Sequence, residues 1–170
     1  MTAAPDPSAM ILLVKHDSLG LLKAAYSSAV VPTSIIEVIP SNSLDEAITG
    51  DWLELQDPDT NYVMRVDGIQ ARSGIKLSVH EEACIALAIQ RGAHPVITVD
   101  REVQQAARLL GVSAEGIPSL IIAASRLGAI SKEEGIRLFH KIYAELLPGL
   151  GIEMILRNSH AFDRNPPRTQ

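Results

Sequence analysis

The stretch LSVHEEACIALAIQRGAHPVITVDR, residues 77–101, decides the fold of this chain. Its first half predicts a helix from Ser78 to Arg91, because apolar residues recur along it and Gly92 stands where helices commonly end. Its second half contains a β-branched run, Pro95–Val99, which predicts a buried strand. Asp100 follows at once. A helix, a strand and a further helix at this spacing favour an α/β domain with a mainly parallel central sheet flanked by helices.

The segments on either side continue this alternation. Upstream, the sequence predicts helices over Met10–Tyr26 (broken near Asp17), Thr33–Ile39 and Leu44–Gly50, and strands over Ala29–Val31 and Trp52–Leu55. Turn signals mark 57–59 and 67–68 within the stretch 57–74. Downstream, it predicts helices over Arg101–Leu110, Pro118–Leu127 and Ser131–Leu147, a linker or strand over Val112–Gly116, and a last short element over Gly151–Arg157.

Length and composition favour one domain with a sizeable core. The chain has 170 residues, of which 46% are hydrophobic and 4% aromatic, and small aliphatic residues suit helices packed on a parallel sheet. We expect a single domain over residues 1–162 and a disordered tail over 163–170. The net charge of -5 argues against an obviously basic nucleic-acid binder.

The single cysteine and the apolar pattern favour a cytoplasmic protein. Cys84 has no partner for an intramolecular disulfide, and it falls in the apolar stripe of its helix, where a core residue is expected. The first residues lack the basic region of a secretory signal, and no apolar stretch reaches the length needed to span a bilayer. We therefore expect no membrane partner.

Acidic residues stand at the ends or starts of several apolar segments: Asp6, Glu37, Glu81, Glu82 and Asp100. Carboxylates that gather where several elements meet can hold Mg²⁺ or Mn²⁺, which prefer oxygen ligands. Because ligands of parallel sheets bind beyond the carboxyl ends of the strands, Asp100 is selected, as is Asp6 if the first residues form a strand. Such a first strand is weak, since Pro5 cannot donate a ladder hydrogen bond.

Each acid also has an ordinary structural explanation. Asp100 suits the N-cap of the helix that follows, and Glu81 is spaced to close a capping box with Ser78, which makes Glu82 the better ligand candidate of the pair. Glu37 reads equally well as a solvated residue, and Asp6 as part of an exposed N-terminus. The sequence alone leaves these alternatives open.

Taken in their order along the chain, these segments resemble the PIN-domain superfamily, and within it the branch of predicted nucleic-acid-binding proteins related to toxin–antitoxin ribonucleases. The resemblance rests on four segments: Ala29–Pro32 followed by Glu37, Glu81–Ala88, Val96–Arg101, and Gly128–Ile130. It implies a PIN-like three-layer α/β fold. The family's first acidic motif falls on residues 6–10, with Pro7 and Ala9 in place of its threonine and proline. The second glutamate of its Gly-Glu-x-Glu-Ala segment falls on Ala83, one position from Glu82.

The resemblance implies an Mg²⁺- or Mn²⁺-dependent ribonuclease, the toxin of a toxin–antitoxin pair. Asp6, Glu37, Glu82 (or Glu81) and Asp100 would hold the metal and carry the reaction. Ser8 would orient Asp6, and Arg101 would contact a substrate phosphate. RNA is the implied substrate, and an antitoxin protein and a second copy of the chain are the implied protein partners. The alternative is a catalytically silent PIN-like module that acts through protein or nucleic-acid contacts.

Overall fold

The computed structural model describes residues 1–146 of the chain. They fall into two compact units, one over Met1–Ile117 and one that starts at Pro118. The predicted element over Gly151–Arg157 and the predicted tail lie outside the described residues.

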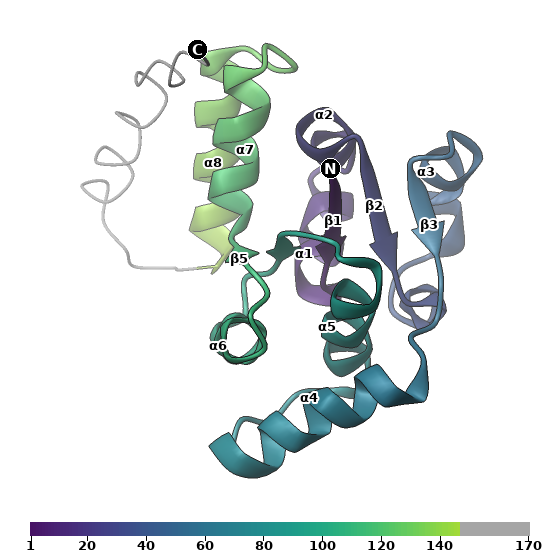
Figure 1. Ribbon diagram of the computed structural model, residues 1–170. Coiled ribbons are helices and arrows are strands. Elements are labelled where there is room, and N and C mark those ends of the chain that lie inside the picture. The colour runs from purple at the N-terminus through teal and green to yellow at the C-terminus, as the bar shows by residue number, and fades with distance from the viewer. Residues whose placement is uncertain (147–170) are drawn as a thin grey trace, which may run out of the picture. The chain divides into compact units, whose positions relative to one another are not determined.

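The first unit is built on a five-stranded sheet with the order β3-β2-β1-β4-β5 (Figure 1). All four strand pairings are parallel, which confirms the predicted α/β class. The strands are β1 (Thr2–Pro5), β2 (Ser28–Val31), β3 (Leu53–Leu55), β4 (Val96–Ile97) and β5 (Ala114–Glu115). The pairing Ala4 opposite Val96 and Pro5 opposite Ile97 sets β1 and β4 in register, so both strands end at the same edge.

The first strand is the central one, although its sequence suggests a weak strand. Pro5 is tolerated because it is the last residue of β1, and the next amide, Asp6 N, restores the ladder by donating to Ile97 O at 2.9 Å. Ala3 and Ala4 are fully buried. Their small side chains leave room for the helices that pack on this strand.

Helices connect the strands of the first unit and cover its sheet. They are α1 (Pro7–Lys15), α2 (Gly20–Tyr26), the 3₁₀ helices η1 (Thr33–Glu37) and η2 (Ser41–Ser43), α3 (Asp45–Thr49), α4 (Thr60–Ser73), α5 (Val79–Arg91) and α6 (Arg101–Leu109). Two further helices, α7 (Ile117–Arg126) and α8 (Lys132–Leu146), follow them in the chain. The predicted break near Asp17 is confirmed, and Asp17 itself has φ 50°.

Two predicted elements are corrected by the structure. The turn signal at Asp67–Gly68 is wrong, because both residues lie inside α4; the burial of Val66 in the core beside α5 outweighs the low helix propensity of Gly68. The helix predicted over Thr33–Ile39 is a 3₁₀ helix that ends at Glu37. The other predicted helices and strands are present, with their ends shifted by a few residues, apart from the ends that fall outside the described residues.

Helix α5 is the centre of the first unit. Its residues Cys84 to Ala88 are all fully buried, and the helix lies against β1, β2 and β4 with α4 and α6 beside it. Ser78 and Glu81 form the predicted capping box at its start, and Gly92 ends it with φ 59°. The Cys84 thiol donates to the carbonyl of Ala4 at 3.6 Å, so it is a core residue, as expected. The N-terminus of α5 is thereby held firmly against the sheet.

The second unit contains most of α7 and all of α8. Ser131 Oγ accepts from Glu134 N at 3.1 Å and so caps the start of α8. Phe139 and Tyr143, one turn apart on α8, stack with ring centroids 4.4 Å apart.

Candidate functional site

The candidate site is at the edge of the sheet where β1 and β4 end. Asp6 directly follows β1, and Thr98 and Asp100 follow β4. Because the two strands are parallel neighbours in register, these three residues leave the sheet side by side. Asp6 and Asp100 therefore lie at the same edge of the sheet, as predicted from the rule that ligands bind beyond the carboxyl ends of parallel strands.

Asp6 is fully buried rather than frayed. Its Oδ1 accepts from Ser8 Oγ at 2.7 Å and from Ala9 N at 2.8 Å, and its Oδ2 accepts from Thr98 Oγ1. The bond from Ala9 makes Asp6 the N-cap of α1. The expected role of Ser8 in orienting Asp6 agrees with this contact.

The pKa of Asp6 is raised to about 6, chiefly by burial and to a smaller extent by the negative charge of Glu81, while the hydrogen bonds from Thr98, Ala9 and Ser8 act in the opposite direction. The thiol of Cys84 responds in the same way, since burial and the charges of Asp6 and Glu81 all raise its pKa. Asp6 and Glu81 are therefore close enough to repel each other. A cation bound nearby would stabilise the ionised form of the Asp6 carboxylate.

One of the two carboxylate oxygens of Asp100, Oδ2, is available to bind a ligand. Its Oδ1 caps α6 by accepting from Glu102 N at 2.6 Å and Val103 N at 3.2 Å. No group among residues 1–146 donates to its Oδ2. The N-cap explanation and the ligand explanation of Asp100 are thus compatible, since each oxygen has one role.

Thr98 links the two aspartates. Its hydroxyl donates to Asp6 Oδ2 and accepts from Asp100 N at 2.9 Å. It is fully buried in a run of aliphatic residues. Sequence reasoning missed this residue, although a hydroxyl inside a buried β-branched run is a visible signal, since a buried polar group needs hydrogen-bond partners.

The structure separates Glu81 from Glu82. The charge of Glu81 contributes to the raised pKa of Asp6, and Glu81 Oε2 accepts from Ser78 N at 2.7 Å. Glu82 interacts with Asp67 on α4. Burial is the main cause that raises the pKa of Glu82 to about 7, followed by a hydrogen bond with Asp67 and by the negative charge of Asp67. Its Oε1 is buried with no hydrogen-bond partner. Of the two glutamates, Glu81 is the one whose charge acts on Asp6.

Glu37 is the last residue of η1, and its side chain contacts His80 on α5. Its side chain is 68% exposed, and its Oε2 lies 3.8 Å from His80 Nε2. The opposite ring nitrogen of His80 bonds to Ser34 Oγ at 3.1 Å. Since His80 precedes Glu81, this contact ties Glu37 to the start of α5. Sequence reasoning missed Ser34 and His80, because neither has the paired spacing of a metal motif.

The acids therefore meet in pairs rather than at a single point. Within residues 1–146, no three side chains of the His, Cys, Asp and Glu types are grouped closely enough to hold a metal ion. The pairs are Asp6 with Asp100 through Thr98, Asp6 with Glu81 through space, and Glu37 with His80. Glu82 is not among them.

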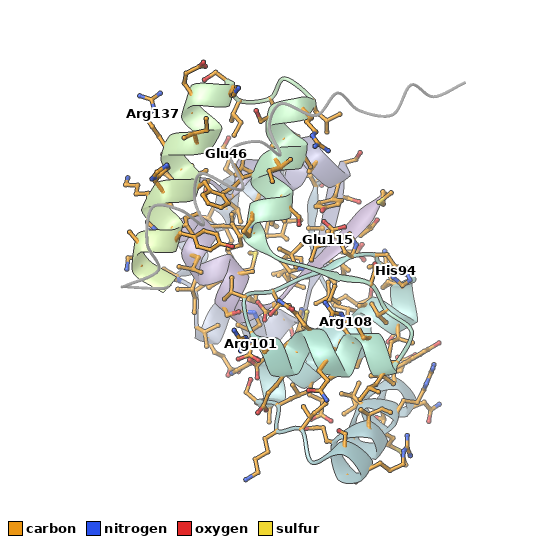
Figure 2. The ribbon with its side chains drawn as sticks, turned by 90° about the vertical axis from the view of Figure 1, so that its left-hand side faces the viewer. Glu46, His94, Arg101, Arg108, Glu115 and Arg137 are labelled. Carbon is orange, nitrogen blue, oxygen red and sulfur yellow. The ribbon has the colours of Figure 1, made fainter. Side chains whose placement is uncertain are left out.

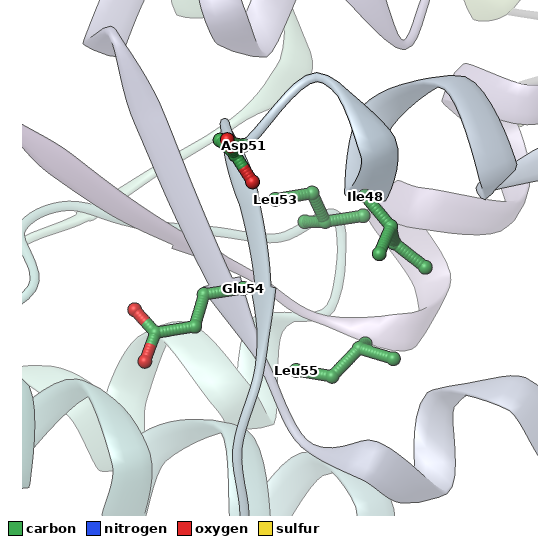
Figure 3. Close-up of a pocket in the computed structure, with 5 residues that line it drawn as sticks. All are labelled: Ile48, Asp51, Leu53, Glu54 and Leu55. Carbon is green, nitrogen blue, oxygen red and sulfur yellow. The ribbon is translucent and has the colours of Figure 1, made fainter.

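A separate hollow of about 460 Å³ lies at the β3 edge of the sheet, lined by Ile48, Asp51, Leu53, Glu54 and Leu55 (Figure 3). Leu53 and Leu55 point to the side of Ile48, and Glu54 points the opposite way. Arg91 binds both carboxylate oxygens of Glu54 at 2.7 Å. This hollow is two strands away from β1 and contains none of the predicted site residues.

Fold and site together define the class of protein: a parallel α/β protein with acidic residues at the carboxyl ends of its central strands. The chain belongs to the PIN-domain family, whose model, described as a PIN domain, matches residues 3–146. The PIN domain is a nuclease-type fold. The match confirms the predicted superfamily and fold. No curated protein matches this chain. Among residues 1–146, no helix has both the length and the apolar character needed to cross a membrane.

The burial of Asp6 predicts how its replacement changes stability with pH. The folded pKa of about 6 is above the ordinary value of 3.8. The protonated carboxyl group of Asp6 therefore stabilises the folded protein fully below pH 3.8, and this contribution is lost as the pH rises through 6. At pH 7 the ionised group lowers the free energy of unfolding by about 3 kcal/mol. Asp6→Asn should raise stability at pH 7 by up to this amount, and the gain should shrink as the pH falls to 4.

Urea denaturation of both proteins at several pH values measures this difference. The exposed Asp51→Asn is the matched control and should stay within about 0.5 kcal/mol of the parent protein at every pH. If Asp6→Asn is less stable than the parent protein at pH 7, the ionised carboxylate is a structural requirement and its burial does not lower stability.

Proposed function

We propose that this protein is a PIN-type ribonuclease that hydrolyses phosphodiester bonds of RNA with Mg²⁺ or Mn²⁺. The observation that carries the proposal is the buried carboxylate of Asp6, joined through Thr98 to Asp100 and facing the charge of Glu81. Each of these acids also caps a helix, but capping does not account for a buried carboxylate whose pKa is raised by a second acid. Perturbed acids of this kind are typical of functional sites.

The type of donor suits a hard divalent cation, although within residues 1–146 no three of these side chains are grouped closely enough to hold one without rearrangement. All donors are carboxylate oxygens, and the repulsion between Asp6 and Glu81 is relieved when a cation is bound. Asp6, Glu81 and Asp100 would hold it, with Glu37 contributing from η1. A bound metal would supply an activated water and would stabilise the charge on the leaving oxygen.

The chain's own residues prepare this site. Thr98 and Ser8 each donate to one oxygen of Asp6 and hold its carboxylate in place. The amide of Glu102 at the start of α6 binds Asp100 Oδ1, which fixes the orientation of Asp100 Oδ2 as well. His80, held by Ser34, keeps the exposed Glu37 near the start of α5. Such supporting hydrogen bonds orient ligands and commonly change activity 10- to 100-fold, to order of magnitude.

Glu81 takes the place of Glu82 in this site, because the Glu82 carboxyl interacts with Asp67 on α4. The proposal also includes the biological setting implied by the family resemblance. In that setting the protein is a cytoplasmic toxin, neutralised by an antitoxin protein and able to pair with a second copy of itself.

A second candidate function is a catalytically silent PIN-like module. Two observations favour it. Pro7 and Ala9 replace the threonine and proline of the family's first acidic motif, and the acids of the described residues do not form a group of three. The net charge of -5 also suits a protein partner.

Cleavage of a labelled single-stranded RNA separates the two functions. With Mn²⁺ the parent protein should cleave, and a chelator should abolish cleavage. Asp6→Asn, Glu81→Gln and Asp100→Asn should each lower the rate by at least roughly 100-fold, since each removes a ligand. All three should stay folded, because Asn is as good an N-cap as Asp and Gln also closes a capping box.

The matched control is Glu82→Gln, the same change one position further along α5. It should leave cleavage within about threefold of the parent rate, since changes away from a site have small effects. Cleavage that survives the chelator and Asp100→Asn, or that depends on Glu82 and not on Glu81, contradicts the proposed site.

Calorimetric titration with Mn²⁺ tests the site without RNA. The parent protein should bind and Asp6→Asn should not. Because Asp6 must lose its proton to bind metal, affinity should fall up to tenfold per pH unit below about 6. Absence of binding at millimolar Mn²⁺ and pH 7.5 supports the silent module instead.

A further inference from the structure

The outward face of α6 carries a shallow groove beside the candidate site. It has a volume of about 420 Å³ and is lined by Arg101, Gln104, Gln105, Arg108 and Leu109. These positions follow the helical spacing of three to four residues and therefore share one face of α6. Figure 2 labels the two arginines, which stand near opposite ends of the helix.

The guanidinium groups of the two arginines in this α6 groove have no partner of opposite charge among residues 1–146. Both residues are exposed, and neither side chain makes a hydrogen bond or an ion pair with this described part of the chain. Arg91, by contrast, binds Glu54 at 2.7 Å. The one acid on α6, Glu102, accepts from the backbone of Lys76 at 3.0 Å and does not line the groove. In a chain of net charge -5, this is an uncompensated positive surface.

The groove begins next to the proposed catalytic acids. Arg101 is the residue after Asp100, whose Oδ1 caps the same helix. Arg108 follows seven residues later, about 10 Å further along the helix axis. A ligand lying in the groove would therefore run from the carboxyl edge of the sheet along α6.

We propose that the α6 groove binds the sugar–phosphate backbone of single-stranded RNA on its way to the acidic site. A guanidinium group binds phosphate in a planar, bidentate manner, and two of them at this separation suit two phosphates of one strand. The amides of Gln104 and Gln105 lie between them and can donate to phosphate or ribose oxygens. Leu109 is 53% exposed and gives a base an apolar surface. The groove provides the positive charge that the acidic site lacks.

The inference rests on the proposed function only in taking RNA as the ligand, because binding in the groove needs neither metal nor cleavage. The test uses the full chain, a fluorescein-labelled polyuridine 12-mer and a chelator, with anisotropy as the readout at several salt concentrations. The double variant Arg101→Gln/Arg108→Gln should bind at least about 10-fold more weakly at low salt. Its slope of log affinity against log salt should be smaller by about 1.4, because each phosphate that an arginine neutralises contributes about 0.7.

The matched control is Lys23→Gln, which removes a positive charge from an exposed position on α2. It should keep the parent affinity and slope. Circular dichroism confirms that each variant is folded. The inference is overturned if the double variant binds like the parent, or if Lys23→Gln weakens binding as much per charge.

The same variants separate this inference from the proposed function. If the parent cleaves with Mn²⁺ and the double variant shows unchanged KM and unchanged binding, the groove is wrong and the nuclease stands. If the arginines carry RNA binding but no cleavage occurs with any metal, the nuclease is wrong and the groove stands. If both are right, the double variant raises KM with little change in kcat.

Discussion

The hydroxyl of Thr98 is the contact on which the acidic site depends. It lies between the carboxylate of Asp6 and the backbone of Asp100, and so it joins the first residue after β1 to the first turn of α6. This contact requires that β1 and β4 be parallel neighbours in register. The burial of α5 against both strands maintains that register and places Glu81 near the same edge. The fold thus concentrates acidic groups at one edge, and the burial of Asp6 there raises its pKa.

Much of this architecture could be predicted from local patterns. The apolar stripe of α5, its capping box and Gly92 determine the helix from neighbouring residues alone. Prediction failed where contacts between residues that are distant in the sequence determine the local structure. β1 looks weak because Pro5 lacks an amide proton, yet its central place depends on pairing with residues 28–29 and 96–97. Likewise α4 contains Gly68, and only its packing beside α5 explains the helix.

The site was predictable to a similar extent. Asp6 and Asp100 follow from the rule that ligands bind beyond parallel strand ends. The sequence could not show that Glu81 and Glu82 have different neighbours, because one helical position rotates a side chain by about 100° and the direction of the core was unknown. Thr98 and His80 act only through residues distant in the chain. In our proposal, the positive groove on α6 supplies the charge that an acidic protein needs to hold a polyanion near these carboxylates.

The central claim is that Asp6 belongs to a cation site and not merely to a helix cap. It is tested most directly by following the carboxyl carbon of Asp6 by NMR during a pH titration, without and with Mg²⁺. We expect Asp6 to titrate near pH 6 in the free protein, and we expect Mg²⁺ to move this titration well below its free value while the exposed Asp51 is unchanged. Titration of Asp6 near the ordinary value of 3.8, or a titration that Mg²⁺ does not move, would contradict the claim.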